Sequence, residues 1–312
     1  MTTPAPPRVE DRQIVVLFQS DTSLNGPMVY SIIDQLGGVC LDEEKQPRVD
    51  LWLESPGGDA HAAYKLALFL RARFEKVYVV VPDYAKSAAT LLALAADTIY
   101  MAPSAELGPL DMQENREGDI RLRSALDTAH SIEALFQRAV QNALVEGGQV
   151  IQATRLSREK VITHLLEFSA NFYRPLIEQL DPLAIFAAST GLEVTVEYGI
   201  RLLQGNNPMA PPEILRERVR TLVTGYPTHG FVIDRNEARS LGLPVVDIRE
   251  YDMRIEVESA FRSQQESGAN IITVGTPADF KIVSKDNGGG EEDDKATSNG
   301  RAKANSRTKA NA

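Results

Sequence analysis

Two short segments, about thirty residues apart, carry residue types suited to acyl transfer. The first is Ser55 to Asp59 (SPGGD) and the second is Tyr84 to Thr90 (YAKSAAT). Paired glycines at a strand-to-helix turn leave backbone N–H groups uncovered, because no Cβ blocks close approach. A serine among small residues at the next such turn exposes its hydroxyl at a helix N-terminus. Together the segments predict a nucleophile facing an oxyanion hole.

The elements around these segments follow the rhythm of an α/β protein. Apolar β-like runs alternate with Ala/Leu-rich helical runs over roughly the first 115 residues. We expect strands at 13–18, 49–53, 77–81 and 98–101, and helices at 27–36, 60–74 and 87–96. This alternation is typical of right-handed βαβ units built on a parallel sheet.

From Ser124 onward the pattern becomes helical. We expect helices at 124–145, 157–180, 192–203 and 213–223, with the run broken by Pro182 and by 208–212. Short elements at 231–233, 235–241 and 245–248 then return to the sheet. We expect a further helix at 252–265, followed by strand-like segments at 271–274 and 280–283. The simplest interpretation is a helical region, about 124–223, within a single domain of residues 13–283.

Composition limits the remaining classes. The chain has 312 residues, a formal net charge of −10 and one cysteine, Cys40. The charge argues against nonspecific nucleic-acid binding, and a single cysteine excludes an internal disulfide. No apolar stretch reaches the ~18 residues of a membrane span, and residues 1–12 do not resemble a secretory signal. We therefore expect a cytoplasmic protein with disordered ends at 1–12 and 284–312.

The same segments resemble the Clp/crotonase superfamily of serine peptidases, and most of all the serine dehydrogenase proteinase family, relatives of signal-peptide peptidase A and ClpP. The matching stretches are 53–59 (LESPGGD), 84–101 (YAKSAATLLALAADTIYM), 107–113 (LGPLDMQ) and 226–243 (YPTHGFVIDRNEARSLGL). They lie in family order within residues 14–248. The resemblance implies a crotonase-like fold of repeated ββα units with an added helical region. It also implies an ATP-independent peptidase without metal or cofactor that assembles as a homo-oligomer.

The resemblance assigns roles residue by residue. Ser87 occupies the nucleophile position, and the N–H groups of Gly57 or Gly58, together with that of Ala88, occupy the oxyanion-hole positions. The segment around Asp111 corresponds to the wall of the substrate groove. The chain departs from its relatives at the base, because no histidine follows Ser87 at the ClpP spacing and no lysine lies where signal-peptide peptidases have theirs.

Several residues are candidates for the general base. His229 precedes a returning strand, and imidazole titrates near neutral pH. His130 lies on an expected helix at about the signal-peptide-peptidase spacing, and Lys160 is the only lysine between Ser87 and Phe280. Lys86 adjoins the nucleophile but should point away from it. Asp111 either orients a histidine or forms a turn.

The leading hypothesis is a serine peptidase that cleaves peptides or unfolded protein through an acyl-enzyme. The alternative is a noncatalytic peptide-binding or scaffold member of the family that has lost its base. A third hypothesis is an acyl-CoA hydratase or isomerase, in which the same hole would polarise a thioester. No HExxH, CxxC or clustered acidic pattern indicates a metal site.

Overall fold

The computed structural model describes residues 13–20, 23–39, 45–111, 113–114, 123–154, 156–252, 254–266 and 271–280. The expected disordered ends, and Cys40, lie outside these residues, so those expectations stay predictions. The domain boundaries also stay predictions.

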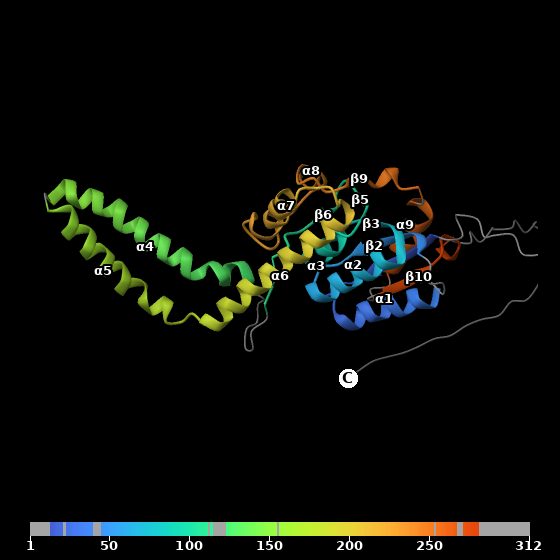
Figure 1. Ribbon diagram of the computed structural model, residues 1–312, viewed down its shortest axis with the longest axis horizontal. Coiled ribbons are helices and arrows are strands. Elements are labelled where there is room, and N and C mark those ends of the chain that lie inside the picture. Colours follow the sequence, from blue (N-terminus) through green and yellow to red (C-terminus); the bar gives the residue numbers. More distant parts are fainter. Residues whose placement is uncertain are drawn as a thin grey trace, which may run out of the picture. The chain divides into compact units, whose positions relative to one another are not determined.

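A six-stranded sheet forms the centre of the fold (Figure 1). Its order is β10-β1-β2-β3-β5-β9, and every neighbouring pair is parallel except β10 with β1. The strands are β1 (Gln13–Gln19), β2 (Gln46–Glu54), β3 (Phe74–Val81), β5 (Thr98–Met101), β9 (Val245–Asp247) and β10 (Ile271–Gly275). The C-terminal parts of the central strands, 51–53 in β2 and 79–81 in β3, are apolar and fully buried, as expected where both faces of the sheet are covered. The expected α/β class is confirmed.

A second, smaller layer follows the ends of the main strands. Parallel strands β4 (Tyr84–Ala85) and β6 (Glu106–Leu107) pair here, and isolated bridges join Leu24 to Gly58, Ser55 to Ala85 and Leu107 to Ile233. A long strand, a short strand and a helix therefore follow one another at β3-β4-α3. This is a ββα unit of the kind that the resemblance implies, and Ser87 lies at the turn between β4 and α3.

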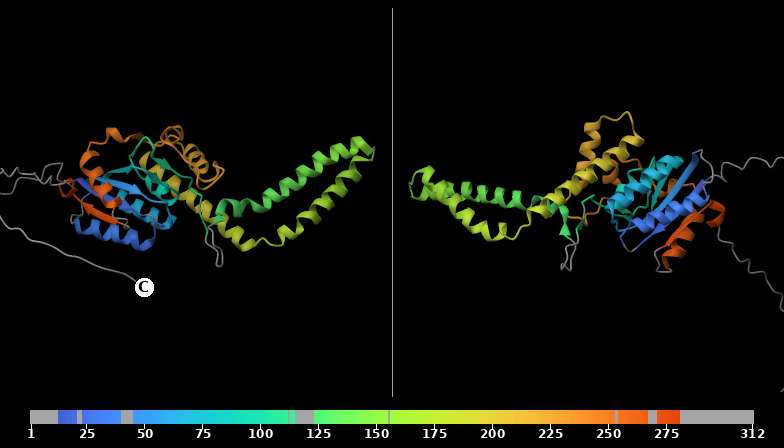
Figure 2. Two further views of the ribbon diagram at one scale, coloured as in Figure 1. Left: turned by 180° about the vertical axis from the view of Figure 1, so that it is seen from behind. Right: turned by 60° about the horizontal axis from the view of Figure 1, so that its bottom comes forward.

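Helices cover both faces of the sheet (Figures 1 and 2). The first face carries α1 (Gly26–Val39), α2 (Ala60–Arg73) and α3 (Ala88–Ala93), while α9 (Arg254–Glu266) and the 3₁₀ turns η2 (Ile248–Glu250) and η3 (Pro277–Phe280) cover the other. The remaining helices are α4 (Ala125–Thr154), α5 (Arg158–Ile177), α6 (Pro182–Asn206), α7 (Pro212–Thr224) and α8 (Arg235–Ser240). A short hairpin, β7 (Gln113–Glu114) with β8 (Arg123–Ser124), precedes α4.

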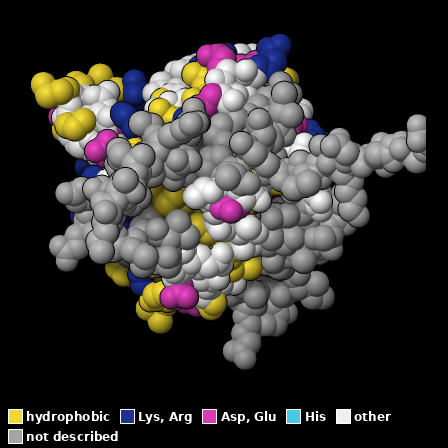
Figure 3. Space-filling view, turned by 90° about the vertical axis from the view of Figure 1, so that its right-hand side faces the viewer, with side chains coloured by type: hydrophobic (Ala, Val, Ile, Leu, Met, Phe, Trp, Pro, Cys, Tyr) yellow, Lys and Arg dark blue, Asp and Glu magenta, His cyan; other side chains and the backbone are white. Residues whose placement is uncertain are grey.

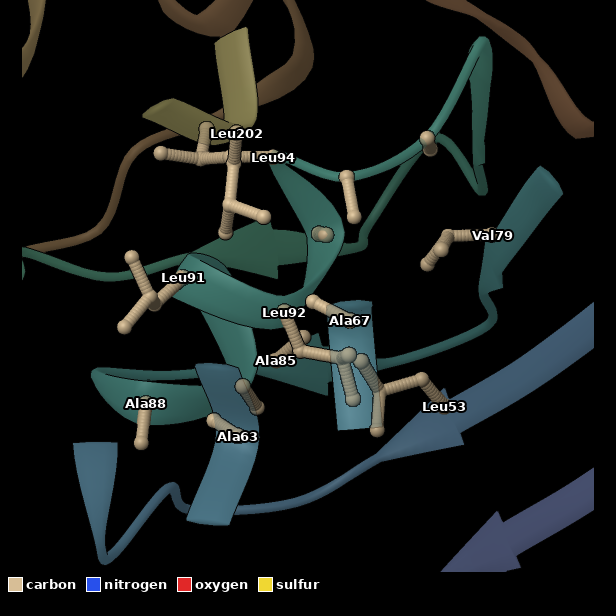
Figure 4. Packing of buried hydrophobic residues seen from close by; sticks show 14 of the residues in the cluster. Leu53, Ala63, Ala67, Val79, Ala85, Ala88, Leu91, Leu92, Leu94 and Leu202 are labelled. Atoms are coloured by element: carbon tan, nitrogen blue, oxygen red, sulfur yellow. The ribbon is translucent and has the colours of Figure 1, made fainter. Parts of the chain in front are cut away.

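The packing around α3 is dense. Every residue of this helix is buried, and Figure 4 shows Leu92 directed toward Ala67 of α2 and Leu53 of β2. Asp59 caps α2 by accepting a hydrogen bond from the His61 amide at 2.8 Å. The two helices that follow the site's turns are thus rigidly held.

The other face of the sheet contains a buried polar cluster around Trp52. Tyr251 donates a hydrogen bond to the Asp50 carboxylate at 2.5 Å, and its ring meets Trp52 edge-on at 5.7 Å. Arg48 donates to both Asp50 and Asp252. Because Asp50 is fully buried, these donors offset the cost of removing its charge from water. The cluster fastens the C-terminal segment to the centre of the sheet.

Helices α4 and α5 pack on each other, and α4 also contacts α6. Many large apolar side chains on these helices are exposed, including Phe136, Phe168 and Phe172 at 62–64%. By contrast, the C-terminal half of α6 packs against α3 and α7. Among the described helices, α6 alone is long and apolar enough to cross a membrane, judged by length and composition. On the described part of the face in Figure 3, acidic and basic side chains are interspersed.

Three sequence expectations differ from the structure. Helix α1 continues through Gly37, because nothing in its surroundings opposes a helical glycine there. Pro182 begins α6 instead of breaking a helix, since the first helical position needs no N–H donor. Phe280 lies in a 3₁₀ turn and not in a strand, and the rest of the expected 280–283 strand lies outside the described residues.

Candidate active site

The candidate nucleophile occupies a strained turn between β4 and α3. Ser87 has φ 50° and ψ −119°, and it alone among the described non-glycine residues has a positive φ. Such a conformation costs of order 1–3 kcal/mol and persists only where the surroundings enforce it. Ser87 stands at the N-cap position of α3, yet its side chain makes no capping hydrogen bond. Instead its hydroxyl donates to the backbone carbonyl of Asp111 at 3.5 Å.

The glycine turn packs directly against the serine turn. Ser55 and the β4 segment exchange backbone hydrogen bonds, with the Ser55 amide donating to Tyr84 O at 3.1 Å and the Lys86 amide to Ser55 O at 3.0 Å. A Cβ at Gly57 would lie 2.5 Å from Lys86 O and 2.7 Å from Ser87 Cβ. Only glycine therefore allows the two turns to approach this closely.

The backbone amides near Ser87 differ in what they bind. The Gly57 amide donates to the Ser55 hydroxyl at 3.1 Å, so it is already occupied. For Gly58 and Ala88, no amide partner is found within the described part of the chain. Leu24 bonds to the residues on either side of Gly58, and in parallel pairing this directs the amide of Gly58 away from Leu24. That direction leads to the side on which Ala85 pairs with Ser55.

Asp111 and His229 lie together beside the serine turn. His229 Nδ1 is 3.7 Å from Asp111 Oδ2, which is an ion-pair distance but longer than a hydrogen bond. Nδ1 is buried and has no hydrogen-bond partner among the described residues. Asp111 is only 2% exposed. Asp111 thus contacts both other residues, Ser87 through its backbone carbonyl and His229 through its carboxylate.

The second layer explains why residues so distant in sequence meet. Leu107 in β6 exchanges two backbone hydrogen bonds with Ile233, at 3.0 and 3.1 Å. Asp111 lies four residues after Leu107, and His229 lies four residues before Ile233. The antiparallel bridge therefore sets both side chains near the same end of β6. The sequence indicated a return at 231–233, but that segment joins the small layer and not the main sheet.

Lys86 is engaged elsewhere, and the alternative bases lie on the long helices. Lys86 Nζ pairs with Glu106 at 2.8 Å and donates to the carbonyls of Leu107 and Phe231. His130 is exposed on α4, where it lines the cavity described next. Lys160 is exposed in the first turn of α5, which packs on α4.

A cavity of about 820 Å³ lies between α4, α6 and α7. The Asp111 segment contacts one helix of this cavity, since Leu110 N donates to Leu222 O of α7 at 2.8 Å, next to the lining Val223. The lining is mixed, with apolar residues of α6 and α7 beside the charged Arg216, Arg220, Glu193 and Glu197. A cavity of this volume is within the range of ligand sites.

Sequence reasoning did not assign roles to three residues that hold the site. Ser55 accepts the Gly57 amide, and Ser124 donates to Asp111. Thr90 is fully buried, and its hydroxyl joins Ala85 O at 2.6 Å to the Gly108 amide at 3.0 Å. Only Ser124 carried a signal, because it stands at the expected start of a helix. Among the described residues, no group of three or more His, Cys, Asp or Glu is placed to hold a metal ion.

Comparisons with known proteins agree with the motifs. Residues 36–128 match the family described as ClpP-like SDH-type serine proteinase. This range includes the motifs at 53–59, 84–101 and 107–113, so the resemblance to that family is confirmed.

Two uncharacterised proteins of Methanocaldococcus jannaschii are similar over short stretches. MJ1495 is 42% identical over 78 residues, or 25% of this chain and 26% of that protein. MJ0137 is 46% identical over 69 residues, or 22% and 24%. The chain thus matches only about a quarter of the length of these relatives.

Two solved structures of the 1510-N membrane-bound stomatin-specific protease, both of alanine mutants and one with a substrate peptide, were also found. They share 14% and 15% identity with this chain, with a TM-score of 0.42 for each. Each match covers 76% of this chain, and 80% and 76% of the respective structures.

Proposed function

Because residues 36–128 match the ClpP-like serine dehydrogenase-type proteinase family, we propose that this protein is a serine peptidase with Ser87 as its nucleophile. The observation that carries the proposal is the strained conformation of Ser87 against the glycine turn. A positive φ at a serine that opens a helix holds the hydroxyl out from the backbone, without a capping bond. Strain of this kind is concentrated at functional sites.

The oxyanion hole would consist of the amides of Gly58 and Ala88. Both N–H groups lack partners among the described residues, and the Ala88 amide is at the first position of α3, where no intrahelical acceptor exists. The positive end of the helix adds to the stabilisation of a developing negative charge. We leave the Gly57 amide out of the hole because Ser55 already accepts its hydrogen bond.

His229 would act as the general base and Asp111 as the group that orients it. Asp111 lies on the Nδ1 side of the ring, which leaves Nε2 for the serine hydroxyl. In this scheme Ser87 Oγ attacks the substrate carbonyl carbon and its proton passes to Nε2. The proton then goes to the leaving amine as the C–N bond breaks, and water hydrolyses the acyl-enzyme. Catalytic hydrogen bonds are often long without substrate, so 3.7 Å is compatible with this role.

A fluorophosphonate reagent tests the nucleophile directly. We expect the purified full-length protein to form a covalent adduct at Ser87, identified by peptide mapping, and to hydrolyse unfolded protein without ATP. The Ser87→Ala variant should form no adduct. A folded protein that binds unfolded peptide but neither labels nor hydrolyses would instead be the noncatalytic scaffold, and binding of a CoA thioester would favour the hydratase or isomerase.

The partners and location follow as further proposals. A peptide or unfolded segment would enter the cavity between α4, α6 and α7, beside Asp111. The exposed apolar side chains of α4 and α5 support self-association into a homo-oligomer. Light scattering as a function of concentration would test this, and cell fractionation would test the cytoplasmic location.

A further inference from the structure

The Asp111 carboxylate is held by the beginning of α4. Its Oδ2 accepts a hydrogen bond from the Ser124 hydroxyl at 2.7 Å, and its Oδ1 accepts one from the Leu126 amide at 3.1 Å. Each carboxylate oxygen therefore has a donor from the same helix terminus. With a side chain almost completely shielded from water, Asp111 has no bulk solvent to satisfy these oxygens instead.

The Ser124 hydroxyl is itself fixed in direction. It accepts a hydrogen bond from the Asp127 amide at 3.0 Å, so its own proton is directed to Asp111. Asp111 and Ser124 together satisfy two of the first N–H groups of α4, which have no acceptor within the helix. The candidate orienting carboxylate is thus also part of the cap of a 30-residue helix.

The oxygen that Ser124 holds is the one that His229 approaches. Asp111 Oδ2 lies 3.7 Å from the unpartnered His229 Nδ1. A carboxylate oxygen has two lone pairs, so the bond from Ser124 leaves one for the imidazole N–H. If the carboxylate rotated freely, that lone pair would point at His229 only part of the time.

We propose that Ser124 is a positioning residue for the serine-peptidase reaction, acting through Asp111 on His229. It locks the carboxylate in the rotamer that presents Oδ2 to the imidazole. This inference rests on the proposed function. It adds that the terminus of α4, and not only the body of the fold, sets the geometry of the candidate triad.

The first test compares three variants of the full-length protein by their rate of fluorophosphonate labelling at Ser87. Ser124→Ala should slow labelling about tenfold and lower kcat for peptide hydrolysis with little change in KM. Ser124→Thr, which keeps the hydroxyl, should restore most of the rate. Ser131→Ala is the matched control, because its hydroxyl bonds within α4, to Thr128 O, and not to Asp111. If wild type labels but Ser124→Ala labels at the same rate, the inference is wrong while the proposed function stands. If wild type does not label, the proposed function itself fails.

A second test separates positioning from a structural role in α4. In an Asp111→Asn background, Ser124→Ala should slow labelling by less than twofold, because the group it acts through is already gone. A full tenfold effect in that background would show that Ser124 acts by another route.

Discussion

Large apolar side chains are buried in the α/β body, whereas many of them are exposed on the α4–α5 helical pair. In the body, Leu91 and Leu92 are completely buried, and they belong to α3, the helix that begins directly after Ser87. On α4 and α5, Phe136, Phe168 and Phe172 remain more than 60% exposed. The body can therefore enforce a strained backbone, whereas the helical pair obtains much less stabilisation from its own packing. This difference is the basis of our proposal that the chemistry takes place in the body and that the helical pair contacts another molecule.

Removing the candidate bases one at a time tests whether the general base lies in the body or on the helical pair, and it should give the largest effect. His229 belongs to the body, while His130 and Lys160 belong to the helical pair. His229→Ala should lower the rate of Ser87 labelling by about 10³-fold or more, as for loss of a triad member. His130→Ala and Lys160→Ala should stay within about twofold of wild type. A large loss in Lys160→Ala would move the base to the helical pair and contradict our assignment.

The loss of unfolding free energy on removing an apolar side chain should also differ between the two regions. Leu92→Ala removes a fully buried side chain and should cost about 2–5 kcal/mol of unfolding free energy in urea. Phe172→Ala removes an exposed ring and should cost less than about 0.5 kcal/mol at protein concentrations where the chain is monomeric. Similar losses in the two variants would show that the helical pair is packed as firmly as the body.

Replacing a glycine by alanine should have opposite effects on stability in the two regions. Gly57 has φ 98° and no room for a Cβ, so Gly57→Ala should cost about 2 kcal/mol or more and reduce Ser87 labelling. Gly148, within α4, has open space around it, so Gly148→Ala should stabilise α4 by up to about 1 kcal/mol. Thermal unfolding followed by circular dichroism distinguishes the two, and equal melting temperatures would contradict the close approach at Gly57.

The smallest expected effect concerns acid sensitivity in the body. Hydrogen bonds from Arg249, and the ion pair with Arg235, lower the pKa of Asp247 below its ordinary value. A depressed pKa stabilises the fold above the unfolded-state value of about 3.9 and loses this effect as the pH falls below it. Asp247→Asn should therefore be less stable than wild type at pH 7, with the difference shrinking towards pH 2. A difference that stays constant between these pH values in urea titrations would rule out the linkage.

Much of the body could be predicted from the sequence because its signals are local. Apolar runs and Ala-rich segments marked β2, β3, α2 and α3, and the Asp59 cap was readable from its position. The end of α1 was missed because helical packing tolerates Gly37. The two-residue strands β4 and β6 were not foreseen, since elements so short have no periodicity.

The residues of the candidate site could likewise be predicted only where their signal is local in the sequence. Ser87 and the glycine turn stood out as motifs in adjacent units. The hydrogen bond from the Gly57 amide to Ser55 depends on the rotamer of the Ser55 side chain. The approach of Asp111 to His229 depends on the bridge between Leu107 and Ile233. Neither a rotamer nor a bridge between segments more than a hundred residues apart leaves a pattern in a single sequence.

The cluster around Trp52 gives the molecule a built-in optical reporter. Trp52 is the sole tryptophan of the chain, and its ring lies against Tyr251 and Phe261, which arrive some two hundred residues later. The intrinsic fluorescence of Trp52 therefore reports whether residues 251–261 have packed against the sheet. During synthesis, a nascent chain that ends before Tyr251 would leave this indole without its aromatic neighbours, so this part of the fold can be completed only after residues 251–261 have left the ribosome.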